Sequence, residues 1–435
     1  MTGETELRSR PTARTLDAVA ALTLLLVFLY GIPSRLIFAP LGAVGTPALV
    51  FSLGLFLWWV TYRILSPAPS FQPVKLPLVL LGASALVSYA VAALHPIEPL
   101  EVGAADRGLL SILAWAGIAL VAADGVRSRQ RLRQLLDRLV TAGTVLAGFG
   151  LLQFFVSLDV SRWYRIPGLS VNGALTLVQQ RQGFSRVAGL ADHPIEFSVA
   201  LAMLFPLALH FAFHAEPSRR RWAWLRVLVI AVGIPVSISR SGVLALVVAM
   251  VILVPTWPVR RARRALLATP VFLMGLKVLV PGLLGTVAGL FLNFHRDTSI
   301  STRTEDYELV SQYFRGSPIV GHGWSTFKGA TNLLLDNQWL YTLVQWGLLG
   351  VAALVSLFAI GMGTARGARR RAQDAEGREL GQVLAASIGA AMVSFVSFDA
   401  LAYPIVTCTL FLLVGCAGAF WRLTRERQLE AVVRS

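Results

Sequence analysis

Charged residues are scarce in this 435-residue chain, at 14% of the sequence against 55% for apolar residues. An average soluble domain carries about 25% charged residues, so the composition argues against that class. The apolar residues gather in runs of roughly 17 to 25, the length of a helix that crosses a bilayer. The sequence therefore predicts an all-α polytopic membrane protein. Its excess of arginine over lysine, 36 to 3, is typical of a GC-rich bacterial source.

Cysteine is nearly absent as well. Cys408 and Cys416 are the only two, and eight residues along a helix separate them by about 12 Å, too far for a disulfide. We expect both to be packing residues. The sequence also lacks a metal-binding Cys/His cluster and a phosphate-binding nucleotide loop. No metal, no cofactor and no ATP-driven transport by this chain alone are therefore expected.

Hydropathy and helix breakers predict about twelve transmembrane helices. They lie near residues 16–33, 41–62, 75–94, 107–123, 134–157, 191–213, 222–239, 241–257, 265–282, 337–362, 381–398 and 402–421. An even number returns both termini to one side. The arginine-rich segments fall on that side at alternate loops, so both termini are predicted to be cytoplasmic, in a bacterial inner membrane.

The predicted organisation is a cytoplasmic tail (1–15), a transmembrane domain (16–421) and a second cytoplasmic tail (422–435). The first apolar run lacks a small-residue cleavage site, so we expect a retained helix. The net charge of +16 reflects this topology, with some attraction to membrane lipid, and no nucleic-acid partner is expected.

Two outer loops, residues 158–190 and 283–336, are longer than hairpins between helices require. Such loops are where function should be sought. Topology does not require basic residues on this side, so its arginines are candidates for binding an anion. The first four are Arg186, Arg240, Arg303 and Arg315.

Arg240 lies in "PVSISRSG", at an outer turn between two predicted spans. Gly242 and the flanking serines permit a tight, partly unwound turn whose backbone N–H groups could meet an anion. The alternative is an arginine that only reaches the lipid headgroups. Arg186, in "GFSRVAGLADHPIEFS" at the outer end of another span, favours the first interpretation.

The stretch "STRTEDYELVSQYF" (301–314) resembles a helix start, with Thr302 as N-cap and Glu305 as its capping-box partner. Helical spacing places four residues on one face: Arg303, Tyr307, Val310 and Phe314. An apolar stripe with an arginine at its N-terminal tip would lie on the membrane surface and present positive charge to an anion.

Three residues are candidates for acid–base chemistry, each with a structural alternative. His322, between two glycines, could be a reachable imidazole or only a turn residue. Asp336 could act on a hydroxyl or could be the N-cap of a helix that starts at Asn337. His193, in "ADHPIEFS", could support Arg186 or could cap the helix that follows it. Tyr403 and Asp399, at a hairpin further on, are interpreted as interfacial anchors.

The order of these motifs resembles the O-antigen ligase and polymerase superfamily. They are "RVAG…HPIEFS", "ISRSG" opening a span, and an outer loop with "STRTEDYELVSQYF…SPIVGHGWSTF" and "DNQWLYTLVQWGLLG". The resemblance covers roughly residues 180 to 360 and the twelve-span layout. It implies a fold similar to GT-C-type glycosyltransferases, which pass a glycan from a polyprenyl diphosphate to a hydroxyl at the outer membrane face.

By this resemblance, Arg186 and Arg240 hold the donor diphosphate and Arg303 opens the large loop. One departure matters. Lipopolysaccharide ligases usually show a histidine just before Asn-x-x-Leu, assigned to acceptor activation, and this chain has Asp336 in "DNQWL". An aspartate can still orient or deprotonate a hydroxyl, but the change weakens any inference that the acceptor is lipid A core.

The resulting hypothesis is a metal-independent, inverting ligase with a polyprenyl-diphosphate-linked glycan as donor and a glycan or glycolipid as acceptor. Asp336 is the expected base and His322 its competitor. A polymerase that joins lipid-linked repeat units stays open as the alternative. A lipid or solute transporter is disfavoured, because the mid-span regions are almost uniformly apolar and no internal repeat is visible.

Overall fold

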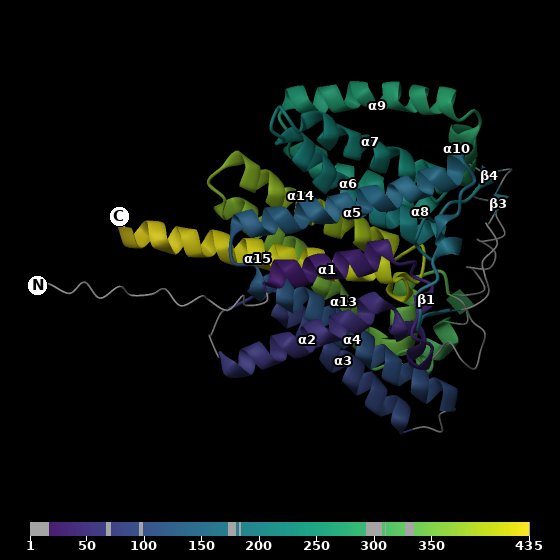
Figure 1. Cartoon of the computed structure of the whole chain (residues 1–435). Helices are drawn as coiled ribbons and strands as arrows, with labels where there is room; N and C mark the ends of the chain where they lie inside the picture. Colours follow the sequence, from purple (N-terminus) through teal and green to yellow (C-terminus); the bar gives the residue numbers. More distant parts are fainter. Residues whose placement is uncertain are drawn as a thin grey trace, which may run out of the picture.

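The computed structural model describes residues 17–66, 71–94, 99–172, 180–181, 184–292, 307–308, 310–326 and 335–434. Within these ranges the fold is helical, apart from two pairs of very short strands, as predicted. Long helices run between two ends of a bundle (Figure 1). We call the end where α6 and α8 begin the loop end, and the opposite end, where α5 and α14 begin, the arginine end.

Each predicted range coincides with a helix, although α4 begins eight residues before its predicted range and α13 and α15 end nine and thirteen residues after theirs. The first helices are α1 (Ala18–Gly31), α2 (Pro47–Leu65), α3 (Lys75–Ala93), α4 (Pro99–Gly125), α5 (Arg129–Phe155) and α6 (Pro194–Phe213). They are followed by α7 (Arg220–Val236), α8 (Arg240–Leu253), α9 (Val259–Leu279), α10 (Leu283–Leu292), α13 (Gln338–Arg371), α14 (Ala375–Ser394) and α15 (Pro404–Arg434). Because α15 continues to Arg434, the predicted C-terminal tail is helical through that residue.

Among the described residues, seven helices are long and apolar enough to cross a membrane: α2, α3, α4, α5, α6, α13 and α15. An eighth span results if α9 and α10, which are bent by 113° at their junction, are taken together. The chain is thus a polytopic membrane protein. The apolar helices α1 and α8 are shorter, and α14 carries several charges in its first turns, so the count of twelve crossings stays a prediction.

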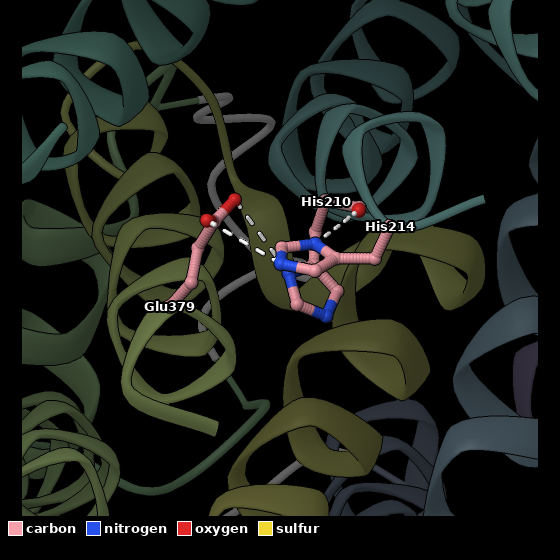
Figure 2. A group of neighbouring side chains, drawn as sticks. All are labelled: His210, His214 and Glu379. Atoms are coloured by element: carbon pink, nitrogen blue, oxygen red, sulfur yellow. Dashed lines mark hydrogen bonds and ion pairs between the residues drawn. The ribbon is translucent and has the colours of Figure 1, made fainter. Parts of the chain in front are cut away.

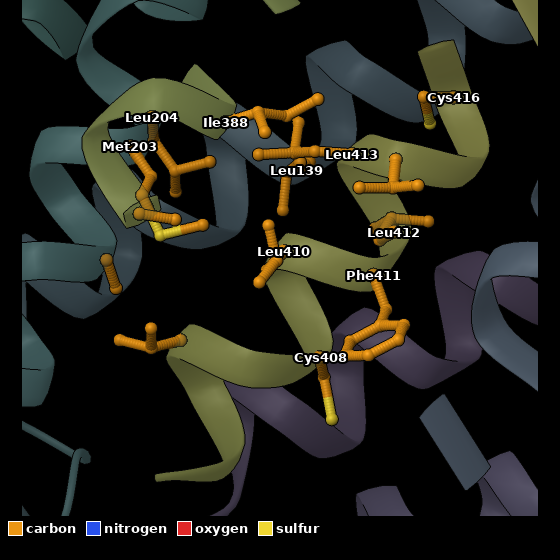
Figure 3. Packing of buried hydrophobic residues seen from close by; sticks show 14 of the residues in the cluster. Leu139, Met203, Leu204, Ile388, Cys408, Leu410, Phe411, Leu412, Leu413 and Cys416 are labelled. Carbon is orange, nitrogen blue, oxygen red and sulfur yellow. The ribbon is translucent and has the colours of Figure 1, made fainter. Parts of the chain in front are cut away.

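Helices α6 and α15 form the centre of the bundle, since 89% and 94% of the residues in their most apolar stretches are buried. The free thiols of Cys408 and Cys416 lie among leucines of this core (Figure 3), which confirms that they are packing residues. Helix α9 is the opposite case. This helix lies along one edge of the bundle (Figure 1). Leu276 is its one buried residue and most of its apolar side chains are exposed, as expected for a surface that faces lipid.

Ion pairs hold the arginine end together. Arg129 donates two hydrogen bonds, of 2.6 and 2.7 Å, to the carboxylate of Asp374, which also caps α14. Arg133 contacts Glu376 at 2.6 Å, so α5 is tied to the start of α14 at two points. The basic residues that indicated topology are therefore also structural at this end.

Two antiparallel strand pairs cover the loop end. β1 (Leu36–Ile37) pairs with β2 (Ser170–Val171), and β3 (Gln180–Arg181) pairs with β4 (Phe184–Ser185). Short 3-10 helices complete the connections at this end: η1 (Ala39–Gly45), η2 (Val160–Trp163) and η5 (Ala400–Ala402). Another, η3 (Val254–Thr256), follows the far end of α8. The long loop predicted over 158–190 is thereby fastened to the first connection of the chain.

Candidate functional site

The start of α6 is the best-defined part of the loop end. His193 is the N-cap, and its Nδ1 accepts a hydrogen bond of 3.1 Å from the backbone N–H of Ile195. Pro194 occupies the first helical position, where a missing N–H costs nothing. Burial, together with the nearby charge of Arg186, lowers the pKa of His193 to about 4. The ring is therefore neutral near pH 7, with its proton on Nε2.

Glu196 joins α6 to α15 beneath this cap. Its side chain is fully buried, and its two carboxylate oxygens accept hydrogen bonds from Asp192 N (2.8 Å) and Ile405 N (2.7 Å). Asp192 lies just before α6 and Ile405 lies in the first turn of α15, where backbone N–H groups have no partner within the helix. One side chain therefore provides hydrogen-bond acceptors at two helix starts. Glu196 was not among the predicted site residues, although an acidic residue three positions after a helix cap is a known signal.

Arg186 is held at this end by its neighbours in the chain. It follows β4 directly and is half-buried. The next residues are fixed to α5, because Gln153 Oε1 accepts hydrogen bonds of 3.0 Å from both Ala188 N and Gly189 N. The fold therefore places the guanidinium near the start of α6, where its charge acts on His193.

Arg240 is the first residue of α8, also at the loop end and half-buried. The tight turn before it is as predicted: Ser239 caps α8, and Ile238 adopts a φ of 50°, which is unusual for a branched residue. The role predicted for Gly242 is wrong. Gly242 lies in the first turn of α8 and not in the turn before that helix. A Cβ at this position would stand 2.4 Å from the side chain of Ser198 on α6. The glycine allows α8 to start against α6.

Tyr403 lies where α6, α13 and α15 meet, with its ring 6.0 Å from that of His193. Burial raises its pKa, and four nearby carboxylates raise it further: Asp399, Glu196, Asp192 and Asp336. Asp336 is thus within electrostatic reach of the α6 start, although 143 residues of sequence separate it from His193. Tyr403 is accordingly part of this site as well as a residue at a helix start.

Asp336 itself is exposed, and its predicted structural role is wrong. The N-cap of α13 is Asn337, whose Oδ1 accepts hydrogen bonds from Trp339 N (2.9 Å) and Leu340 N (3.3 Å). Asp336 therefore precedes the cap and is not needed for it. A small apolar cluster fixes its backbone: Val310, Leu335, Tyr341 and Val344.

The segment with His322 docks onto a break in α13. Gly347 has a φ of 62° and a ψ of −159°, which interrupts the helix. The freed backbone groups are satisfied by the segment, as His322 N donates to Val344 O (3.0 Å) and Leu348 N donates to Pro318 O (2.9 Å). Irregular backbone of this kind is tolerated in a membrane protein where other protein segments cover it.

His322 is a turn residue with an exposed ring, as one predicted alternative had it. Both neighbours, Gly321 and Gly323, have positive φ angles of 72° and 126°. The Nε2–H of His322 donates to Tyr313 O at 2.7 Å, and the ring stands edge-on against that of Tyr313. Its Nδ1 is consequently the atom that would accept a proton.

The remaining predicted residues are only partly described. Arg315 is exposed, at the end of the helical stretch 310–316. Arg303 and the predicted helix start at Thr302 lie outside the described residues, as does part of the 283–336 loop. That loop begins with α10, which was not predicted as a separate helix. Whether Arg303 joins the site stays a prediction.

Comparison with known proteins identifies one family. Residues 225–355 match the family described as O-Antigen ligase, and this range includes Arg240, His322 and Asp336. No curated protein matches the chain. One similar solved structure is described as "Structural coordination of polymerization and crosslinking by a peptidoglycan synthase complex". Its chain shows 17% identity and a TM-score of 0.39, with 87% of this chain and 97% of that chain covered. That likeness carries no argument.

The family match falls on the later motifs that carried the resemblance, whereas "RVAG…HPIEFS" with Arg186 and His193 lies before the matched range. It spans the turn at Arg240, the segment docked on α13 and the first half of α13 itself. The resemblance is therefore confirmed over this range, and residues 225–355 of this polytopic membrane protein are similar to the O-antigen ligase family.

Proposed function

We propose that this protein transfers a glycan from a polyprenyl diphosphate to an acceptor hydroxyl at the outer face of the bacterial cytoplasmic membrane. The observation that supports the proposal is that Arg240 begins α8 and Arg186 lies near the start of α6, at the end of the bundle that also carries Asp336, a carboxylate that no cap requires. Arg186 and Arg240 stand beside the first turns of adjoining helices, and Asp336 acts on Tyr403 next to them. With twelve crossings and cytoplasmic termini, the loop end would face outward.

The two arginines suit a diphosphate. Each guanidinium presents a planar fork of N–H donors that matches phosphate oxygens, and its charge is permanent. The start of α8 adds backbone N–H groups and the positive end of a helix dipole beside Arg240. Because arginines supply the positive charge, the proposal requires no metal at this end of the protein.

The proposed reaction is an inverting displacement. The acceptor oxygen forms a bond to the anomeric carbon while the bond from that carbon to the diphosphate oxygen breaks. The acceptor proton passes to the carboxylate of Asp336, and the polyprenyl diphosphate leaves with its additional negative charge stabilised by Arg186 and Arg240. Neutral His193, with its proton on Nε2, is suited to donate a hydrogen bond to the departing oxygen rather than to act as base.

A transfer assay tests the proposal. The purified protein in detergent is mixed with a polyprenyl-diphosphate-linked glycan and an acceptor glycolipid, and the product is quantified by mass spectrometry. Arg186→Lys and Arg240→Lys should each lower transfer at least tenfold, since an ammonium cannot reproduce the bidentate contact. Arg162→Lys is the matched control, because Arg162 is exposed at the same end and, within the described part of the chain, pairs with Asp159 three residues before it. Wild-type transfer by both test variants would refute diphosphate holding.

A deletion strain separates the two transferase alternatives. Accumulation of finished lipid-linked chains indicates a ligase, whereas accumulation of single lipid-linked repeats indicates a polymerase. An unchanged glycan profile would contradict both and would revive the transporter hypothesis.

A further inference from the structure

Three ligand-type side chains meet at the arginine end, far from the site described above. His210 and His214 lie one turn apart near the end of α6 and face Glu379 on α14 (Figure 2). His210 Nδ1 is 3.7 Å from Glu379 Oε1, and His214 Nε2 is 3.9 Å from Glu379 Oε2. A hydrogen bond between such atoms would be about 2.7 to 3.2 Å long, so both separations are too wide.

The orientation of each imidazole directs a nitrogen toward the carboxylate. His214 Nδ1 is 3.0 Å from the carbonyl oxygen of His210, and only an N–H can donate to a carbonyl. In the neutral ring, Nε2 of His214 therefore carries a lone pair, and this lone pair faces Glu379. A histidine that ligates a metal commonly donates its other N–H to a backbone carbonyl in this way.

His210 supplies the second observation. Its side chain is only 2% exposed, and its Nδ1 makes no hydrogen bond with the described part of the chain. A buried polar atom without a partner is costly. Two imidazole nitrogens and a carboxylate around one point are stabilised when a cation lies between them.

The spacing suits a metal ion. Zinc binds imidazole nitrogen and carboxylate oxygen at about 2.0 to 2.2 Å, so neighbouring ligand atoms in a tetrahedron stand about 3.4 Å apart. The three ligand atoms here lie within 4.8 Å of one another, so a small inward movement completes the site. Two histidines four residues apart on a helix, with a carboxylate from elsewhere, are a ligand set that Zn²⁺ and neighbouring transition metals accept.

We propose that His210, His214 and Glu379 bind one divalent transition-metal ion, such as Zn²⁺, which ties the end of α6 to the start of α14. His214 is 24% exposed, so the ion reaches the site from the arginine end and water completes its coordination. His210 lies 17 residues after His193 on one helix, which corresponds to about 25 Å. The ion thus stabilises the bundle without contacting the proposed transfer site. The metal-site proposal therefore does not depend on the proposed glycan transfer.

Arg261 modulates the site. Its Nη1 donates to Glu379 Oε2 at 2.6 Å, and its guanidinium stacks on the ring of Phe213, 3.4 Å from the centroid. The arginine holds the carboxylate in place, but its positive charge repels a cation bound to the same group. Removing that charge should therefore strengthen metal binding, an effect that a purely structural ion pair would not produce.

The test measures metal retention by the full chain, purified without a histidine tag. The protein is loaded with Zn²⁺ alone, passed through a desalting column and analysed by inductively coupled plasma mass spectrometry. We expect about one zinc per chain. His214→Gln and Glu379→Gln should weaken binding at least tenfold, whereas Arg261→Gln should tighten it. His322→Gln, at the loop end, is the matched control and should retain the ion.

A second measurement covers the case in which a variant fails to fold. Wild-type protein loaded with Co²⁺ should show the intense visible absorption of a four-coordinate site with nitrogen ligands. Added Zn²⁺ should displace the Co²⁺ and remove this absorption, and bound Zn²⁺ should raise the melting temperature. Absence of bound metal in the wild type, or equal retention by folded His214→Gln, would overturn the proposal. Weak absorption typical of a hydrated surface ion would overturn it too.

Discussion

Gly347 should be among the least replaceable residues of α13. Its φ of 62° and ψ of −159° belong to a region used almost only by glycine, so alanine there costs about 1 to 3 kcal/mol of backbone strain. An added Cβ would also stand 2.4 Å from the carbonyl of Ile319, which cannot move without leaving its hydrogen bond to Leu349 N.

Displacement of the docked segment adds to this cost. Four backbone hydrogen bonds connect residues 318–323 to the break in α13, and each contributes about 0.5 to 1.5 kcal/mol. Losing half of them together with the strain gives a destabilisation of about 2 to 6 kcal/mol for Gly347→Ala. Because the segment carries His322, transfer activity should fall as well.

Thermal unfolding of the purified protein in detergent measures this loss, and limited proteolysis reports whether residues 317–326 become accessible. Gly363→Ala is the control within the same helix. Apart from the backbone of its own helical turns, no atom of the described residues lies within 4 Å of its added Cβ, so alanine should stabilise the helix by about 0.5 to 1 kcal/mol. If Gly347→Ala melted at or above the wild-type temperature without new cleavage, the close contact between Gly347 and Ile319 would not be what stabilises the break in α13.

Three further predictions concern the candidate site. Asp336→Asn should reduce transfer strongly while leaving expression and donor binding near normal, and full activity in Asp336→Asn with loss in His322→Ala would pass the role of base to the histidine. In Glu196→Gln an amide nitrogen replaces one of the two acceptor oxygens, so either Asp192 N–H or Ile405 N–H loses its hydrogen bond. The free energy of unfolding should therefore fall by about 1 to 3 kcal/mol, and an unchanged melting temperature would contradict this. Because the pKa of His193 falls from 6.5 to about 4 on folding, the unfolded chain binds the proton first as pH drops. The stability that His193 contributes is complete above about pH 6.5 and is lost toward pH 4, so His193→Asn, a cap that does not titrate, should flatten the pH dependence of melting.

Much of the candidate site follows from local sequence, because helix caps and turns depend on neighbouring residues. The proline after His193 predicted a helix start there, and the serines around Arg240 predicted a turn. Local signals also failed where two residues compete for one role. Asp336 and Asn337 are both good caps, and in the structure Asn337 caps α13 while the preceding Leu335 packs into a small apolar cluster.

The sequence by itself determined the class of protein, the position of every long helix and the segments in which to look for chemistry. Hydrophobic runs, prolines and glycines act over a few residues, so they can be recognised without knowing what lies beside them. Only the tertiary structure decided which helix starts share the loop end, that Glu196 serves Ile405 from 209 residues away, and that Glu379 faces two histidines of α6. Those pairings depend on which apolar faces pack together, and in a chain whose helices are apolar on nearly every side, periodicity does not reveal the partner.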